Sequence, residues 1–107
     1  MTTSGQRVAA AADIPAGEVR VVQCGERSLA LSHLDDGYYA IDNICTHDGG
    51  PLGEGRLRNG RVICPRHGAA FDARTGRVVS LPAVRSVQAY PVTVDDDGVY
   101  IDCEAAR

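Results

Sequence analysis

Two short boxes in the middle of the chain combine the side chains that most often bind transition metals. Residues 45–47 read Cys-Thr-His, and residues 64–67 read Cys-Pro-Arg-His after a spacer of sixteen residues. Thiolates and imidazoles together suit iron–sulfur clusters, zinc or copper, whereas magnesium and calcium prefer oxygen ligands. Each box supplies one Cys and one His, which fits a [2Fe–2S] cluster with two Cys on one iron and two His on the other. The candidate metal ligands are Cys45, His47, Cys64 and His67.

This pattern resembles the Rieske family, whose signature is C-x-H, a spacer of fifteen to seventeen residues, and C-x-x-H. The run from Gly68 to Asp72 is similar to the family's continuation of the second box. The resemblance implies one Rieske-type [2Fe–2S] cluster as the cofactor, bound by the four candidate ligands. A structural zinc site is the alternative, because two Cys and two His can complete a zinc tetrahedron. Zinc boxes more often pair Cys with Cys and His with His, so mixed boxes favour the binuclear cluster.

Residues around the boxes depart from those of the high-potential Rieske proteins of respiratory complexes. In those relatives each loop carries an extra Cys, and the two form a disulfide; the matching positions here are Gly50 and Arg66. The relatives also place Ser and Tyr after the second box, where Ala69 and Phe71 stand in this chain. Hydrogen bonds to sulfur raise the potential of a cluster. We therefore predict a potential near the low end of the Rieske range, at about −150 mV.

Length and composition indicate one modest β domain. The chain has 107 residues, and Val outnumbers Leu by twelve to six, a balance that favours strands. A formal charge of −3 argues against nucleic acid or an anionic membrane as a partner. The N-terminus lacks an apolar signal segment, and no stretch is long enough to span a membrane, so we expect a cytoplasmic protein. In that compartment thiols stay reduced, and we expect Cys24 and Cys103 to be free.

Turn residues divide the sequence into short strands. Asp35-Asp36-Gly37 and residues 95–98 are hairpin signals of the Asp-Gly kind. The long stretch from residue 43 to 59 is expected to be an irregular ligand loop, and Pro91 indicates an edge or a bulge. The expected strands are residues 7–11, 19–23, 28–34, 38–42, 61–63, 77–80, 86–94 and 99–103.

These strands predict an all-β fold, an antiparallel β sandwich of the Rieske type. Residues 1–107 form a single domain, in which a small cluster-binding subdomain at about residues 43–82 is inserted between strands of the base. The same layout is what the resemblance implies.

The resemblance to ferredoxin components of bacterial aromatic-ring dioxygenase systems implies a one-electron carrier rather than an enzyme. It would pass electrons from a flavin-containing, NAD(P)H-dependent reductase to a terminal non-haem iron oxygenase, with His47 and His67 on the electron path. We expect a monomer. An oxygenase site needs two more His and a carboxylate, and only His33 remains. The alternatives are a small subunit of an assimilatory nitrite reductase and a structural zinc module that mediates interactions.

Overall fold

The computed structural model describes residues 5–44, 50–65, 68–80 and 85–104. Within these ranges the chain forms strands and two short 3₁₀ turns but no α-helix, so the predicted all-β fold is confirmed. No helix in them is long and apolar enough to cross a membrane. The elements are β1 (Gln6–Ala9), η1 (Ala11–Asp13), β2 (Val19–Cys24), β3 (Arg27–Leu34), β4 (Gly37–Asp42), η2 (Leu52–Glu54), β5 (Arg56–Arg58), β6 (Arg61–Ile63), β7 (Ala70–Asp72), β8 (Val78–Ser80), β9 (Ala89–Tyr90), β10 (Val92–Asp95) and β11 (Gly98–Ile101).

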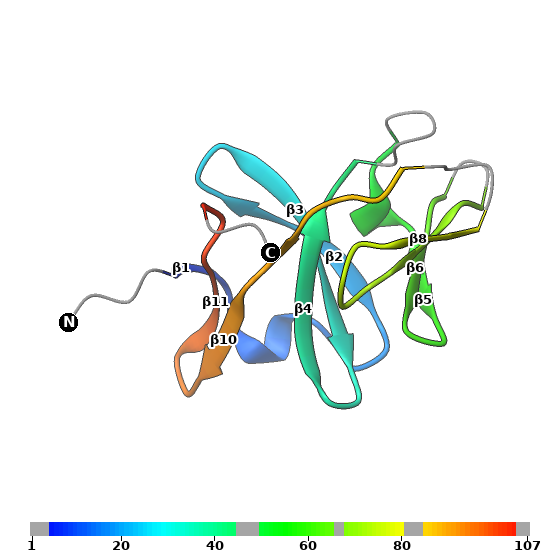
Figure 1. Cartoon of the computed structure of the whole chain (residues 1–107). Coiled ribbons are helices and arrows are strands. Elements are labelled where there is room, and N and C mark those ends of the chain that lie inside the picture. Colours follow the sequence, from blue (N-terminus) through cyan, green and yellow to red (C-terminus); the bar gives the residue numbers. More distant parts are fainter. Residues whose placement is uncertain (1–4, 45–49, 66–67, 81–84, 105–107) are drawn as a thin grey trace.

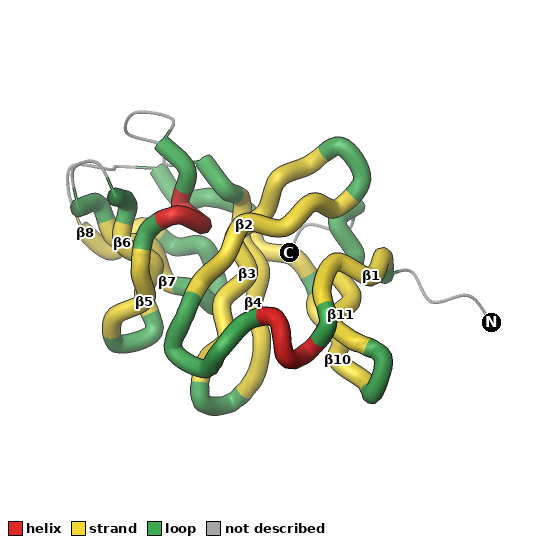
Figure 2. Tube along the Cα trace, turned by 180° about the vertical axis from the view of Figure 1, so that it is seen from behind, coloured by secondary structure: helices red, strands yellow, loops and turns green. Residues whose placement is uncertain are grey.

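The strands form three antiparallel sheets that follow one another along the molecule (Figures 1 and 2). The terminal sheet has the order β1-β11-β10, and the central sheet has the order β2-β3-β4-β9. The third sheet, β5-β6-β7-β8, is called the box sheet here, because the second Cys/His box follows β6. Its strands are only three residues long; β5 follows the segment that carries the first box, and β6 leads into the second box.

Strand β3 of the central sheet is buried on both faces, which explains why it alternates only weakly between apolar and polar residues. Leu29 and Leu31 of β3 face the terminal sheet and pack in one apolar core. Ala30 and Leu34 of the same strand point the other way, into a second core shared with the box sheet. Successive residues of a strand point to opposite faces, so one strand supplies both cores.

Two strands of the box sheet were missed in the stretches predicted as loops. Asn59 and Gly60 both have positive φ, at 53° and 77°, as a type I′ hairpin turn requires. This turn joins β5 to β6, and Leu57 of β5 lies opposite Val62 of β6. The Asn-Gly pair is the strongest short-range hairpin signal, so β5 was predictable. The third strand, β7, is present because Phe71 packs beside Val62, a non-local contact that no short motif indicates.

The strand predicted for residues 86–94 is divided at Pro91. β9 pairs with β4 in the central sheet, whereas β10 pairs with β11 in the terminal sheet. Proline lacks the N–H that continues a ladder, so the chain changes sheets at this residue.

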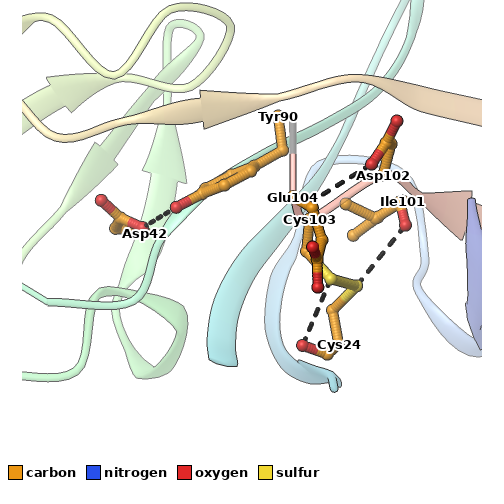
Figure 3. The surroundings of a disulfide bond; sticks show 7 residues. All are labelled: Cys24, Asp42, Tyr90, Ile101, Asp102, Cys103 and Glu104. Atoms are coloured by element: carbon orange, nitrogen blue, oxygen red, sulfur yellow. Dashed lines mark hydrogen bonds between the residues drawn. A yellow bond between two sulfur atoms is a disulfide. The ribbon is translucent and has the colours of Figure 1, made fainter. Parts of the chain in front are cut away.

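Cys24 and Cys103 form a disulfide, so the prediction of two free thiols is wrong (Figure 3). Cys24 ends β2 and Cys103 follows β11, and pairing within the sandwich brings their Cα atoms to 6.1 Å. This distance lies within the range that a disulfide spans. The proximity of two strands so far apart in the chain is not visible in the sequence. The bridge also removes free thiols as an argument for a cytoplasmic location.

Candidate metal centre

Of the four predicted ligands, Cys64 is the one that the described residues include. Its side chain is 2% exposed and belongs to the core shared by the central sheet and the box sheet. Cys45, His47 and His67 lie outside the described residues. The structure therefore shows the ends of both box-bearing segments, and the assignment of the four ligands stays a prediction.

The first segment is closed at its base by residues that flank the box. Ile44 and Pro51 form an isolated antiparallel bridge, so the chain returns to its starting point after six intervening residues. The carbonyl of Asn43 accepts a hydrogen bond from the Leu52 N–H at 3.1 Å. The Asn43 side-chain oxygen accepts a second hydrogen bond, from the Gly53 N–H, at 2.6 Å. Asn43 thus fixes both the entry and the exit of the segment.

The second segment is a tight turn that begins at a buried cysteine. The Cys64 N–H donates to the Ala69 carbonyl at 2.8 Å, and the Gly68 N–H donates to the Cys64 carbonyl at 3.2 Å. Gly68 has φ 78°, a left-handed conformation that glycine adopts without steric cost. Ala69 and Phe71, which follow, are both 0% exposed. The turn is therefore anchored in the core on both sides, while Pro65 and Gly68 stay exposed.

The two segments meet at Gly55. A Cβ atom on Gly55 would lie 1.9 Å from the carbonyl oxygen of Ile63, the residue before Cys64. Only glycine permits this approach. Leu52, which follows the first box, shares one apolar core with Cys64 and Phe71. The exit of the first segment thus packs directly against the entry to the second.

A hydrogen-bonded carboxylate supports the strand that leads into the first box. Asp42, the last residue of β4, accepts a hydrogen bond from the Tyr90 hydroxyl at 2.5 Å (Figure 3). It accepts another from the Gln88 N–H at 3.0 Å. Tyr90 is 3% exposed. Burial, and then the hydrogen bond to Asp42, raise the pKa of Tyr90 to about 12. The pair fixes β4 to β9 immediately before Asn43.

The remaining histidine has a structural environment. His33 on β3 is partly buried, and its ring stacks on Tyr38 with centroids 4.1 Å apart. Its Nδ1 donates to the Ile14 carbonyl at 2.8 Å, since a carbonyl can only accept. Asn43 and Gly55, in contrast, were missed as positioning residues. An Asn between a strand and a Gly- and Pro-rich loop is a signal that could have indicated the first.

The sequence matches the Rieske [2Fe-2S] domain over residues 4–91. The chain belongs to this family. The ferredoxin component of the naphthalene 1,2-dioxygenase system of Pseudomonas aeruginosa is 36% identical over 84% of this chain and 86% of the relative. The cofactor of the family is one Rieske-type [2Fe–2S] cluster, as predicted.

Solved Rieske structures share the whole fold. The ferredoxin of carbazole 1,9a-dioxygenase from Nocardioides aromaticivorans IC177 superposes with a TM-score of 0.87 at 30% identity, over 92% of this chain and 97% of that one. A ferredoxin solved in complex with the oxygenase of carbazole 1,9a-dioxygenase gives a TM-score of 0.83 at 34% identity, covering 94% of each chain. The predicted Rieske-type fold is confirmed. These relatives are electron-transfer components, in agreement with the prediction that the chain is not itself an enzyme.

The described residues fit a Rieske cluster. Cys64 supplies a buried sulfur at the base of a tight turn, and small residues keep the two box-bearing segments in contact. When bound, a Rieske cluster supplies one-electron redox chemistry. The protein's own contribution is the rigid base made by Asn43, Gly55 and the shared core.

Proposed function

We propose that this protein is a one-electron carrier of a multicomponent oxygenase system, with Cys45, His47, Cys64 and His67 as the ligands of its cluster. The cluster would accept an electron from a flavin-containing, NAD(P)H-dependent reductase and deliver it to a terminal non-haem iron oxygenase. The observation that carries this proposal is the contact of Gly55 with Ile63, which brings the exit of one box together with the entry to the other.

The ligand assignment is supported by chemistry and position. Each box carries one Cys and one His, the ligand set that places two Cys on one iron and two His on the other. We propose that His47 and His67 lie on the electron path, and that the ligand-bearing part extends over about residues 43–82. Similar ferredoxins of dioxygenase systems support the role and the oxygenase as partner. We further propose that the carrier is a monomer. We also propose that it is cytoplasmic, because the electrons are proposed to come from an intracellular nucleotide.

Analysis of metal and sulfide tests the cluster and its ligands. We expect iron and labile sulfide in equal amounts, and an electron paramagnetic resonance (EPR) spectrum of the reduced protein with nitrogen hyperfine coupling from His. Cys64→Ser is expected to lose the colour, whereas Cys103→Ser, outside the boxes, should keep it. Zinc in place of iron, or full colour in Cys64→Ser, would refute the assignment.

Turnover tests the role. The protein is combined with NADH, a flavin-dependent ferredoxin reductase and a terminal oxygenase from the source cell. We expect product formation that depends on the amount of this protein and ceases in Cys64→Ser. Product formed at the same rate without the protein would contradict the proposal.

A further inference from the structure

The charges of this chain are strongly segregated along the sequence. From Arg56 to Arg85 there are seven Arg and one acidic residue, Asp72, which gives this stretch a charge of +6. The rest of the chain has four Arg and thirteen acidic residues, a charge of −9. Although the net charge is −3, the chain therefore has a basic region, which contains the second box and the box sheet.

Three of these arginines share one face of the box sheet. In the β5–β6 ladder, Arg56 pairs with Ile63 and Arg58 pairs with Arg61. Residues that lie opposite each other in an antiparallel pair point to the same side. Leu57 and Val62, the pair between them, point into the core. Arg56, Arg58 and Arg61 are therefore on the outer side, where all three are exposed, and together they are called the arginine face.

The arginine face is not neutralised within the described part of the chain. None of its three guanidinium groups forms an ion pair there, whereas Arg74 pairs with Asp36 at 3.1 Å. Asp72 lies opposite Arg61, but its Oδ1 accepts the backbone N–H groups of Arg74 and Thr75. Like charges directly opposite each other, as in Arg58 and Arg61, destabilise a sheet. The Arg58–Arg61 pair therefore does not stabilise the fold.

The arginine face borders the proposed cluster site. Arg56, Ile63, Cys64, Pro65 and Gly68 line one surface hollow, together with Glu54 and Gly55. The acidic residues Asp95 to Asp97 occupy the β10–β11 turn, in the terminal sheet at the opposite end of the molecule (Figures 1 and 2). Glu54 in this hollow and Asp36, which pairs with Arg74, reduce the positive charge at this end, but the seven arginines of residues 56–85 outnumber them. The protein therefore has a charge dipole whose more positive end carries the second box.

We propose that the arginine face docks on an acidic surface of the terminal oxygenase, with the charge dipole turning the cluster end towards it. The inference rests on the proposed function. The oxygenase is chosen because a similar ferredoxin has been solved in complex with an oxygenase component. Complementary charge accelerates association and fixes orientation. In the encounter the reduced cluster loses one electron and the oxygenase gains it, and no bond forms or breaks.

The rates at which small charged oxidants oxidise the protein report the charge near the cluster, and no partner protein is needed. The dithionite-reduced protein is mixed in a stopped-flow instrument with ferricyanide, a trianion, or with hexaammineruthenium(III), a trication. Each takes one electron from the cluster. We expect added salt to slow the reaction with ferricyanide several-fold and to accelerate that with the ruthenium complex, because salt screens attraction and repulsion alike. The net charge of −3 predicts the reverse, and that outcome would overturn the proposal.

Two variants with the same change in charge locate the effect. Arg58→Gln removes one charge from the arginine face, and Arg7→Gln removes one from β1 in the terminal sheet, where Arg7 donates a hydrogen bond to the Asp97 carbonyl. We expect Arg58→Gln to slow the ferricyanide reaction roughly two- to fivefold, the effect of one exposed charge pair. Arg7→Gln should change it little. Equal effects of the two variants would contradict the proposal, while iron content and thermal unfolding verify that both are folded.

Arg7→Gln and the double variant Arg58→Gln/Arg61→Gln are then tested with the oxygenase purified from the source cell. We expect a second-order rate of electron transfer that falls with salt and falls again in Arg58→Gln/Arg61→Gln, but not in Arg7→Gln. If the substitutions slow only the reduction of this protein by the reductase, and not its reaction with the oxygenase, the oxygenase is not the partner of the arginine face. Failure of the proposed function would look different, because the reduced protein would then give no Rieske EPR signal or would transfer no electron to the oxygenase at any salt concentration.

Discussion

The side-chain oxygen of Asn43 and the backbone N–H of Gly53 are 2.6 Å apart, and this hydrogen bond joins the two ends of the segment that carries the first box. The Asn43 carbonyl accepts a further hydrogen bond from Leu52. Asn43 thus makes two hydrogen bonds between the start and the end of the loop, whose ends are also joined by the Ile44–Pro51 bridge.

Asn43→Ala is expected to loosen the first loop. It removes an acceptor and leaves the N–H of Gly53, a buried residue, without its partner, at a cost of about 1–2 kcal/mol in the free energy of unfolding. Urea unfolding of the cluster-loaded protein measures this, and the midpoint potential reports whether the loop has moved. Asn43→Asp keeps the acceptor oxygen and serves as the control. Equal destabilisation by Ala and Asp would show that the hydrogen bond is not the cause.

Substitutions at Gly55 and Gly68 distinguish the effect of close packing from the effect of backbone strain. Gly55→Ala places a methyl group 1.9 Å from the Ile63 carbonyl, so the two box-bearing segments must move apart. We expect a loss on the order of 2–3 kcal/mol, as for an overpacked core, together with a lower iron content. The methyl group of Gly68→Ala meets no atom of the described residues within 4 Å, and the φ of 78° opposes the change. Its expected cost is about 1 kcal/mol. If urea unfolding shows that Gly68→Ala is destabilised more than Gly55→Ala, the contact between Gly55 and Ile63 is not the cause.

The disulfide is expected to stabilise the sandwich without affecting the cluster. It closes a loop with a sequence separation of 79, for which chain entropy gives about 4.5 kcal/mol. Cys24→Ala/Cys103→Ala should therefore unfold at a lower urea concentration, while its EPR spectrum stays unchanged. Wild-type protein treated with dithiothreitol is the matching control. If thiol titration finds Cys24 and Cys103 reduced in the purified protein, or if the double variant is as stable as the wild type, the bridge has no such role.

The hydrogen bond between Tyr90 and Asp42 predicts a loss of stability in alkali. The pKa of Tyr90 rises from its ordinary value of 10.0 to about 12 in the fold, chiefly through burial and then through Asp42. The folded state therefore holds the phenolic proton more tightly than the unfolded chain does. This stabilisation is fully present below pH 10 and is lost as the pH rises towards 12.

Tyr90→Phe tests this linkage by unfolding experiments between neutral pH and pH 12. At neutral pH the variant should lose about 1–3 kcal/mol, because the hydroxyl donates to a carboxylate. Its stability should also decline less in alkali than that of the wild type. Tyr100→Phe is the control, since the Tyr100 hydroxyl makes no hydrogen bond within the described ranges. An identical alkaline decline in Tyr90→Phe and wild type would assign the effect to other groups.

Features that depend on neighbouring residues could be predicted from the sequence. Features that depend on contacts between distant segments could not. The Cys/His boxes, the turn at Asp36 and Gly37, and the two faces of β3 are all encoded within a few residues. The strand β7 and the Cys24–Cys103 bridge depend on segments far apart in the chain, which meet only once the sheets form. Gly55 belongs to the same group, because the Ile63 carbonyl that requires a glycine there comes from a different strand. Periodicity carries no information about such contacts.

The absence of hydroxyl groups after the second box predicts a low reduction potential that substitution can raise. Ala69 and Phe71 are both 0% exposed and follow the turn that begins at Cys64. A hydroxyl that donates to a cluster sulfur stabilises the reduced, more negative state, and about 1 kcal/mol corresponds to roughly 40 mV for one electron. Ala69→Ser and Phe71→Tyr should each raise the midpoint potential by an amount of this order. Ala70→Ser is the control, because Ala70 lies on the other face of β7 from Phe71. Protein-film voltammetry decides: an unchanged or lower potential in both variants would exclude these two positions as the source of the low potential.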